Sequence, residues 1–231
     1  MGKKKVYTDE YASRFTRQSV KPRQRLIGVR FLVVSEGEKT EPSYLKAFQN
    51  KERGVYVRVV GTGTNTRQVV DEAIKLKNAI PGSYDMVWAV FDKDSFSDAD
   101  FNAAIQKADS NGIGAAWSNE AFELWYLYHF QNRVTAMSRE NYKKAISNAV
   151  NASPKFKSKK PYVYKKNADD NFEIMNEYGS LKNAIAWSEA KSKEYTDRRY
   201  ATQNPCTMVY KLVRQLLRED VEFEKALSRK I

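Results

Sequence analysis

The fold of this chain is decided by two stretches, Val33-Val34-Ser35-Glu36-Gly37-Glu38-Lys39-Thr40-Glu41 and Ala89-Val90-Phe91-Asp92-Lys93-Asp94-Ser95-Phe96. In each stretch, an apolar run typical of a buried strand ends directly at a group of carboxylates. In an open α/β sheet, the residues just beyond the carboxyl ends of the strands line the ligand crevice. The two stretches therefore predict an acidic crevice at one edge of a sheet.

Strand and helix patterns alternate around these stretches. We expect strands over residues 29–34, 55–60, 86–91 and 113–117. We expect helices over residues 41–49, with Thr40 as the N-cap, then between Thr66 and Pro81, and over residues 98–110 and 120–130. Such alternation is typical of a parallel sheet with right-handed crossovers. Because the first and third strands are neighbours in the common doubly wound order, Glu36 should lie close to Asp92 and Asp94.

After residue 133 the sequence predicts helices alone, over residues 138–150, 169–178, 180–193 and 205–219, and no fifth strand. The predicted fold class is α/β, a mainly parallel Rossmann-like sheet flanked by helices with a helical C-terminal portion. We divide the chain into a basic N-terminal arm (1–25), an α/β domain (26–133) and a helical portion packed on it (134–231).

Composition excludes several classes of protein. With 42% hydrophobic residues among 231, the chain can bury a globular core. It has no apolar run approaching the roughly 18 residues of a membrane span, and no apolar segment follows the basic start. A single cysteine, Cys206, excludes an intramolecular disulfide framework and suits a reducing compartment. We therefore expect a cytoplasmic protein that does not enter a membrane.

The positive charge is large and uneven. The net charge is +12, and residues 151–166 contain six lysines and no acid, interleaved with Tyr and Phe. Such a segment suits a phosphate backbone whose bases stack on aromatic rings, although a solvated loop has the same composition. The predicted nucleic-acid contacts, to RNA or DNA, are Lys155, Lys157, Lys159, Lys160, Lys165 and Lys166, assisted by the basic arm.

The acidic residues are of the kind that bind a hard divalent cation. Asp92 and Asp94, two positions apart in an extended segment, point to the same side, where a shared cation would relieve their repulsion. Gly37 permits the tight turn that exposes Glu36. Mg²⁺ (or Mn²⁺) prefers such oxygen ligands. Aspartates after a strand also cap helices, so the aspartate pair has a purely structural alternative.

Two further carboxylates are candidate ligands for a second metal site. Glu41 opens a helix, where the dipole alone favours a carboxylate. Glu123 lies in an apolar helix, where an unpaired carboxylate is unfavourable, so it requires a partner or a metal. Glu120 is either a further ligand or an incidental helix carboxylate. Lys39 or Lys93 could neutralise charge on a phosphate. These groups predict metal-dependent phosphoryl chemistry, with Glu36, Asp92, Asp94 and Lys39 as the catalytic set.

Other motifs exclude competing chemistry. His129 is the single histidine, so catalysis by a histidine pair and a histidine-rich zinc site are excluded, and a packed role in an aromatic helix is favoured. The loop Gly61-Thr62-Gly63-Thr64-Asn65 does not have the P-loop pattern, so the chain is not expected to hydrolyse ATP itself.

The same residues carry a resemblance. Glu36-Gly37 and Asp92-x-Asp94 resemble the Toprim signature of topoisomerases, primases and OLD-type nucleases. Longer strings resemble the RloB-like family, over about residues 28–220: Glu36-Gly37-Glu38-Lys39-Thr40-Glu41-Pro42-x-Tyr44, Phe91-Asp92-Lys93-Asp94, Asn119-x-Ala121-Phe122-Glu123-Leu124-Trp125 running to His129-Phe130, and Asn204-Pro205-x-Thr207. Glu120 departs from the third string, where a small residue or proline is expected.

The resemblance implies a Toprim-like, Mg²⁺-dependent nuclease in which Glu36 is an acid/base group or a ligand and the aspartates are ligands. It also implies association with restriction and phage-defence loci and an ATPase partner protein. Two alternatives remain: a nucleic-acid-binding subunit without turnover, and an aspartyl-phosphate transfer domain, which would require a fifth strand. The choice among tRNA, other RNA and DNA stays open, as does homo-oligomer formation.

Overall fold

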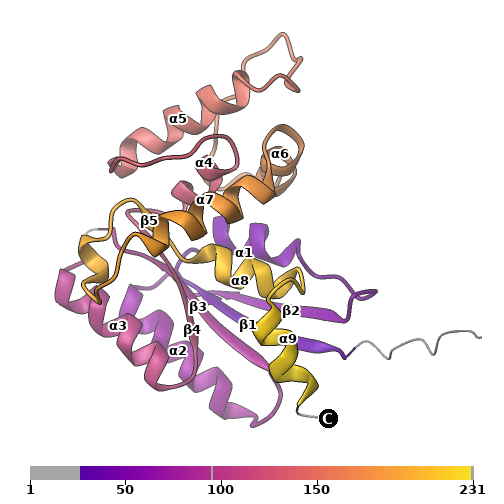
Figure 1. Cartoon of the computed structure of the whole chain (residues 1–231), viewed down its shortest axis with the longest axis vertical. Helices are drawn as coiled ribbons and strands as arrows, with labels where there is room; N and C mark the ends of the chain where they lie inside the picture. The colour runs from indigo at the N-terminus through magenta and orange to yellow at the C-terminus, as the bar shows by residue number, and fades with distance from the viewer. Residues whose placement is uncertain (1–26, 95, 230–231) are drawn as a thin grey trace, which may run out of the picture.

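The computed structural model describes residues 27–94 and 96–229 (Figure 1). The predicted basic arm, residues 1–25, lies outside the described residues. The sheet has the order β2-β1-β3-β4-β5. Its strands are β1 (Val29–Ser35), β2 (Val55–Gly61), β3 (Met86–Asp92), β4 (Gly114–Asn119) and β5 (Cys206–Thr207), of which the first four are parallel and β5 is antiparallel to β4.

The predicted α/β class and the neighbouring positions of the first and third strands are confirmed. The strands are continuous apolar runs because both faces of the sheet are covered, as expected for a parallel sheet. Along β1, Phe31 and Val33 contribute to one hydrophobic cluster while Leu32 and Val34 contribute to the other. Helices α2 (Thr66–Ala79) and α3 (Asp98–Ser110) cover one face (Figure 1).

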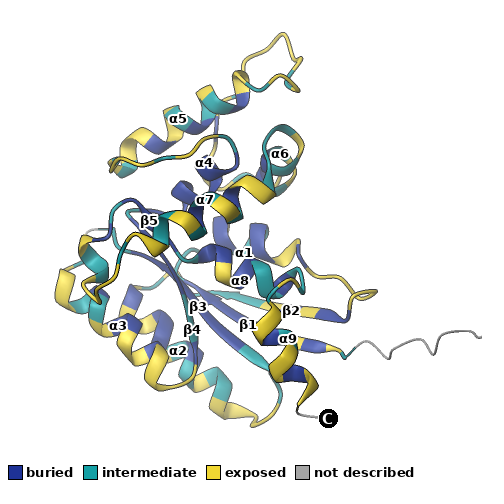
Figure 2. Ribbon diagram, viewed as in Figure 1, coloured by how far each residue is buried: buried dark blue, intermediate teal, exposed yellow. Residues whose placement is uncertain are grey.

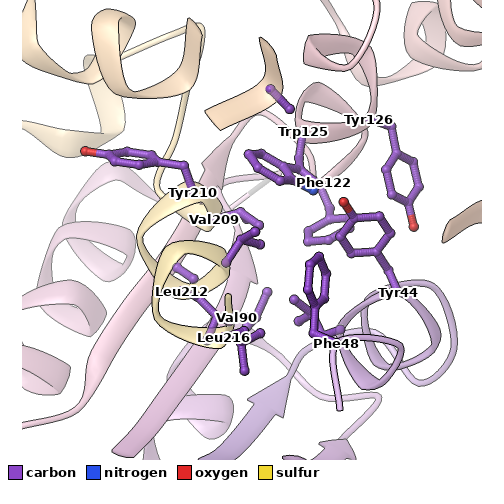
Figure 3. Close-up of a cluster of buried hydrophobic side chains, with 14 of the residues drawn as sticks. Tyr44, Phe48, Val90, Phe122, Trp125, Tyr126, Val209, Tyr210, Leu212 and Leu216 are labelled. Carbon is purple, nitrogen blue, oxygen red and sulfur yellow. The ribbon is translucent and has the colours of Figure 1, made fainter. Parts of the chain in front are cut away.

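The opposite face is covered by α1 (Thr40–Lys46), α8 (Val209–Leu216) and α9 (Val221–Ser228) (Figure 1). Figure 3 shows the cluster beneath them, in which Tyr44 and Phe48 of the α1 region approach Phe122 and Trp125. On the far side of these rings, Val209, Leu212 and Leu216 of α8 pack toward Val90 of β3. The aromatic residues thus join the sheet to the helical portion in one core.

Four helices lie beyond the carboxyl ends of the strands: α4 (Glu123–Tyr128), α5 (Arg139–Asn151), α6 (Asn171–Tyr178) and α7 (Leu181–Lys193) (Figure 1). Figure 2 shows α4 buried and the segment between α5 and α6 exposed, at the end of the molecule opposite α9. A short 3₁₀ turn, Tyr200–Thr202, precedes β5. No helix within residues 27–94 and 96–229 has the length and apolar character needed to cross a bilayer.

Several predicted elements are corrected. The prediction of no fifth strand is wrong, because β5 pairs with β4, and two residues are too short to give an apolar run. The helix expected over 205–219 begins only at Val209, after β5, and α9 has no counterpart among the expected helices. The helix expected over 120–130 is limited to Glu123–Tyr128, so Glu123 is its first residue. Helix α1 begins at Thr40, which is inside it and not its cap. The division into domains at residues 26 and 133 stays a prediction.

Candidate functional site

The turn after β1 places Glu36 against β3. The main-chain N–H of Glu36 donates to the Val90 carbonyl of β3 at 2.9 Å, and its own carbonyl accepts from the Gly63 N–H at 3.0 Å. Its carboxylate Oε2 accepts hydrogen bonds from the Thr66 hydroxyl (3.3 Å) and the Asp92 main-chain N–H (3.4 Å). The expected convergence of Glu36 and Asp92 at the ends of two neighbouring strands is therefore present.

Glu41 reaches the same place from the first turn of α1. Its side chain is 4% exposed, and a Cβ atom built on Gly37 would lie 1.8 Å from its Oε2. Only a glycine at position 37 leaves space for this carboxylate beneath the turn. Glu41 Oε2 accepts no hydrogen bond from any residue that the structure describes. A buried, unpartnered carboxylate oxygen is unfavourable in a resting protein and suits an incoming cation or proton.

The carboxylates of the site are buried and lie close together, and both conditions raise their pKa values. Burial raises the pKa of Asp92 well above its usual value, and the negative charges of Glu41, Glu123 and Glu36 raise it further. Burial also raises the pKa of Glu36, against the hydrogen bond from Asp92, and that of Glu41, against the positive charge of Lys166. These carboxylates thus share one field, in which an added positive charge is favoured.

Two basic side chains from the helical portion balance the acids. Arg139, the first residue of α5, forms an ion pair with the carboxylate of Asp94. The ammonium group of Lys166 lies 4.0 Å from Glu123 Oε1, which also accepts a hydrogen bond from the Tyr164 hydroxyl at 3.3 Å. The other oxygen, Glu123 Oε2, is buried and has no hydrogen-bond partner among the described residues.

These groups surround a cleft of about 530 Å³. It is lined by Glu36, Gly37, Glu38, Lys39, Glu41, Gly63, Thr64, Asp92, Arg139, Lys166 and Asn167. Of the predicted catalytic set, Glu36, Asp92 and Lys39 line the cleft, whereas Asp94 reaches it through its ion pair with Arg139. Glu123 lies outside the lining and contacts the cleft through Lys166. Sequence reasoning missed Arg139, which no motif or spacing distinguishes from other surface arginines.

The donor set fits a hard divalent cation in its chemistry. All acidic groups offer oxygen, and two buried carboxylate oxygens, on Glu41 and Glu123, have no described partner. Within residues 27–94 and 96–229, however, no three His, Cys, Asp or Glu side chains are already arranged around a common point. The outer carboxylates instead face Arg139 and Lys166. The residues that would hold a metal are therefore Glu36, Glu41 and Asp92, with Asp94 and Glu123 paired to cations beside them.

Other candidates have roles away from the cleft. The ammonium group of Lys93 pairs with Asp98, 3.2 Å away at the start of α3. His129 is buried, with Nδ1 donating to the Trp125 carbonyl and Nε2 accepting from the Tyr44 hydroxyl, both at 3.0 Å. Burial lowers its pKa to about 4, which favours the packed role. The Glu120 carbonyl accepts from the Asp94 N–H at 3.2 Å, and its side chain does not line the cleft.

The six predicted nucleic-acid lysines are all exposed, and Lys166 alone among them lines the cleft. All six lie on the segment between α5 and α6, residues 152–170, which Figure 2 shows as largely exposed. Their placement leaves them available to a polyanion.

Comparison with known proteins gives one match. The profile of the RloB-like protein family matches residues 31–216, which include every candidate site residue named above. No curated protein and no solved structure is significantly similar to the chain. Because the match covers more than half of the sequence and spans both the sheet and the helical portion, the chain belongs to the RloB-like protein family.

Proposed function

We propose that this protein is a Mg²⁺- or Mn²⁺-dependent, Toprim-like nuclease that hydrolyses phosphodiester bonds of RNA, with tRNA among the candidate substrates, or of DNA. The observation that carries the proposal is the cleft in which Glu36, Glu41 and Asp92, from three different elements, meet beside basic side chains. Buried carboxylates with raised pKa values and an unpartnered oxygen on Glu41 support cation binding there.

The roles of the residues follow from their positions. When bound, the divalent ion supplies Lewis-acid polarisation of a phosphate oxygen. Asp92 and Glu41, which are both buried, would hold this ion together with Glu36. Glu36 is the more accessible acid and, with its raised pKa, can accept or return a proton at the edge of the cleft. Lys39 is exposed on the rim and neutralises phosphate charge.

The experiment is cleavage of labelled tRNA, single-stranded RNA and duplex DNA with Mg²⁺ or Mn²⁺. Wild type is compared with Glu36→Gln and Asp92→Asn, and with the matched exposed controls Glu52→Gln and Asp109→Asn. The proposal predicts that cleavage falls at least about 100-fold in both site variants, the usual order for loss of a proton-transfer group, and is retained in both controls. Equal cutting by all five proteins would reject the site.

A second candidate is a nucleic-acid-binding subunit without turnover. One observation favours it. Asp94 and Glu123 are paired with Arg139 and Lys166, and no three acidic side chains among the described residues are arranged to hold a metal. Salt-sensitive, metal-independent binding without cleavage would select this candidate. For either one we also propose a cytoplasmic setting, which rests on composition, and a role in phage defence with control by an ATPase partner, which rest on the resemblance to RloB-like proteins. Assembly into a homo-oligomer is a further proposal.

A further inference from the structure

Arg139 and Lys166 belong to the helical portion, yet both line the acidic cleft at the edge of the sheet. Arg139 begins α5, and Lys166 lies before α6, so two separate segments bring cations to one place. Their charges are not spread over the surface with the other lysines. They are directed at the acidic groups that the proposed reaction uses.

The backbone at Lys166 is fixed to the site. The hydroxyl of Thr40 in α1 donates to the Lys166 main-chain carbonyl. Asn171 Nδ2 donates to the same carbonyl at 3.3 Å and to that of Lys165 at 3.1 Å. Thr40 and Asn171 are both 2% exposed. The main chain of Lys166 is thus anchored beside α1 by buried polar groups, whereas Lys157, Lys159 and Lys160 lie in the exposed segment beyond.

Arg139 is similarly constrained by its ion pair with Asp94, and both side chains remain about one-third exposed. They are therefore accessible from the cleft, and the pair is not sealed in the core. A guanidinium group presents a planar fork of donors that binds a carboxylate or a phosphate with the same geometry. Arg139 could thus exchange one oxyanion for another without leaving the cleft.

The charges that line the cleft make such an exchange favourable. Four acidic side chains and three basic ones line it, and Asp94 and Glu123 pair with two of the basic ones, so the formal charge of the whole group is −3. One divalent cation reduces this to −1 and so weakens the repulsion of a phosphate group. Arg139 and Lys166 line the same cleft as Glu41 and Asp92, so a divalent cation held by those carboxylates would repel both basic side chains, and a phosphate bound between them would relieve this repulsion.

We propose that Arg139 and Lys166 are the residues that bind the substrate phosphates, and that their ion pairs with Asp94 and Glu123 are replaced by phosphate contacts when a divalent cation enters the cleft. This inference rests on the proposed nuclease function and deepens it. It assigns substrate binding at the reacting site to two residues of the helical portion, and the ligand is a phosphodiester of RNA or DNA.

The test measures cation binding and nucleic-acid binding separately. The variants are Arg139→Gln and Lys166→Gln, and their matched controls are Lys144→Gln, an exposed position on α5, and Lys46→Gln, an exposed position on α1. Mn²⁺ binding is measured by calorimetry without nucleic acid. Binding of a labelled single-stranded RNA and of a DNA with the same sequence is measured in Ca²⁺, chosen to permit binding while limiting cleavage.

We expect opposite changes in the two affinities. Removing a positive charge from the cleft should strengthen Mn²⁺ binding about 3-fold or more, while removal of a charge-assisted hydrogen bond to phosphate should weaken oligonucleotide binding about 10-fold or more. The control variants should change each affinity less than about 2-fold. Arg139→Lys should recover part of the oligonucleotide affinity. Weaker binding of the RNA, of the DNA or of both identifies which nucleic acid supplies the phosphate.

Two results would overturn the inference. One is that the site variants behave as their controls do; the other is that both affinities fall together with the melting temperature, as expected of a merely structural ion pair. In either case, wild type that binds Mn²⁺ and cleaves nucleic acid keeps the proposed function intact. Wild type that neither binds Mn²⁺ nor cleaves any substrate rejects the function, and the inference with it.

Discussion

The carboxylate of Glu36, one residue beyond β1, accepts a hydrogen bond from the main-chain N–H of Asp92, the last residue of β3, at 3.4 Å. This contact joins the ends of two neighbouring parallel strands, and it brings two acids together that the chain separates by a strand and two helices. The strand order therefore creates the repulsion that the site contains. That repulsion has consequences that can be measured without knowing the substrate.

The first prediction concerns Asp92→Asn and the stability of the metal-free protein. Because the pKa of Asp92 is raised in the folded state, its contribution to stability is fully present below its unfolded pKa and is lost as the pH rises through the folded value. Wild type should lose stability as the pH rises above the unfolded value of about 4, and Asp92→Asn should lose less. Thermal unfolding should show the variant melting several degrees higher at pH 8, since 1 kcal/mol corresponds to roughly 2–4 °C in a chain of this size.

The control is Asp109→Asn at the exposed end of α3, which should follow wild type at each pH. A lower melting temperature for Asp92→Asn at pH 8 would contradict the inference that the charged form of this buried carboxylate destabilises the folded protein. Addition of Mg²⁺ at pH 8 should stabilise wild type more than the variant, because a ligand that binds only the folded state stabilises it by mass action.

Sequence patterns are sufficient where burial leaves a continuous signal. Strands β1 and β3 are apolar throughout because each contributes side chains to both hydrophobic clusters, and their bounds differ from the predicted ones by a single residue. The contact between Glu36 and Asp92 follows from strand order alone. By contrast, β5 is two residues long and owes its existence to pairing with β4, which leaves no local pattern.

The basic half of the site could not be predicted in the same way. Arg139 meets Asp94 because α5 packs on α4, and this depends on the path of the irregular segment between those helices. Composition indicates Lys166 only as a general nucleic-acid contact, whereas its position results from the hydrogen bonds of Thr40 and Asn171. Tertiary contacts of this kind have no periodicity that a single sequence can reveal.

A second prediction concerns Gly37→Ala. The added methyl group would lie 1.8 Å from Glu41 Oε2, so the carboxylate must leave its position under the turn. We expect Mn²⁺ affinity, measured by calorimetry, to fall about 10-fold or more, the equivalent of roughly 1.4 kcal/mol. The matched control is Gly28→Ala, where the nearest atom, on the Tyr56 ring, is 3.4 Å away, an ordinary contact distance. Unchanged Mn²⁺ affinity in Gly37→Ala would remove Glu41 from the set of ligands.

A third prediction uses the single histidine as a reporter of the aromatic core. His129 is buried, and its pKa is lowered to about 4, because burial disfavours the charged form more than its hydrogen bonds to main-chain groups favour it. It should stay neutral from pH 8 down to about pH 5. The neutral His129 therefore contributes to stability above about pH 6.5, the pKa of histidine in the unfolded chain. This contribution is lost as the pH falls toward 4.

The measurement is an NMR titration of the histidine Cε1–H signal, which is unambiguous because the sequence has no other histidine. A midpoint near 6.5 in the folded protein would contradict the buried placement.

Tyr44→Phe removes the hydroxyl that donates to His129 Nε2, and leaving that buried acceptor unpaired should destabilise the protein by about 1–3 kcal/mol.

The last prediction separates the exposed lysine segment from the general positive charge of the protein. Replacing Lys155, Lys157, Lys159 and Lys160 by Gln should weaken binding of single-stranded nucleic acid. The dependence of log K on log salt should fall by up to about 0.7 for each phosphate that is no longer neutralised. The melting temperature and Mn²⁺ affinity should stay unchanged, because all four side chains are exposed and none lines the cleft.

The control replaces the exposed residues Lys46, Lys51, Lys182 and Lys211, with the same change in net charge. If both quadruple variants lower the salt dependence equally, binding reflects the net charge of +12 and not this segment. If the first alone lowers it, the segment between α5 and α6 binds the polynucleotide.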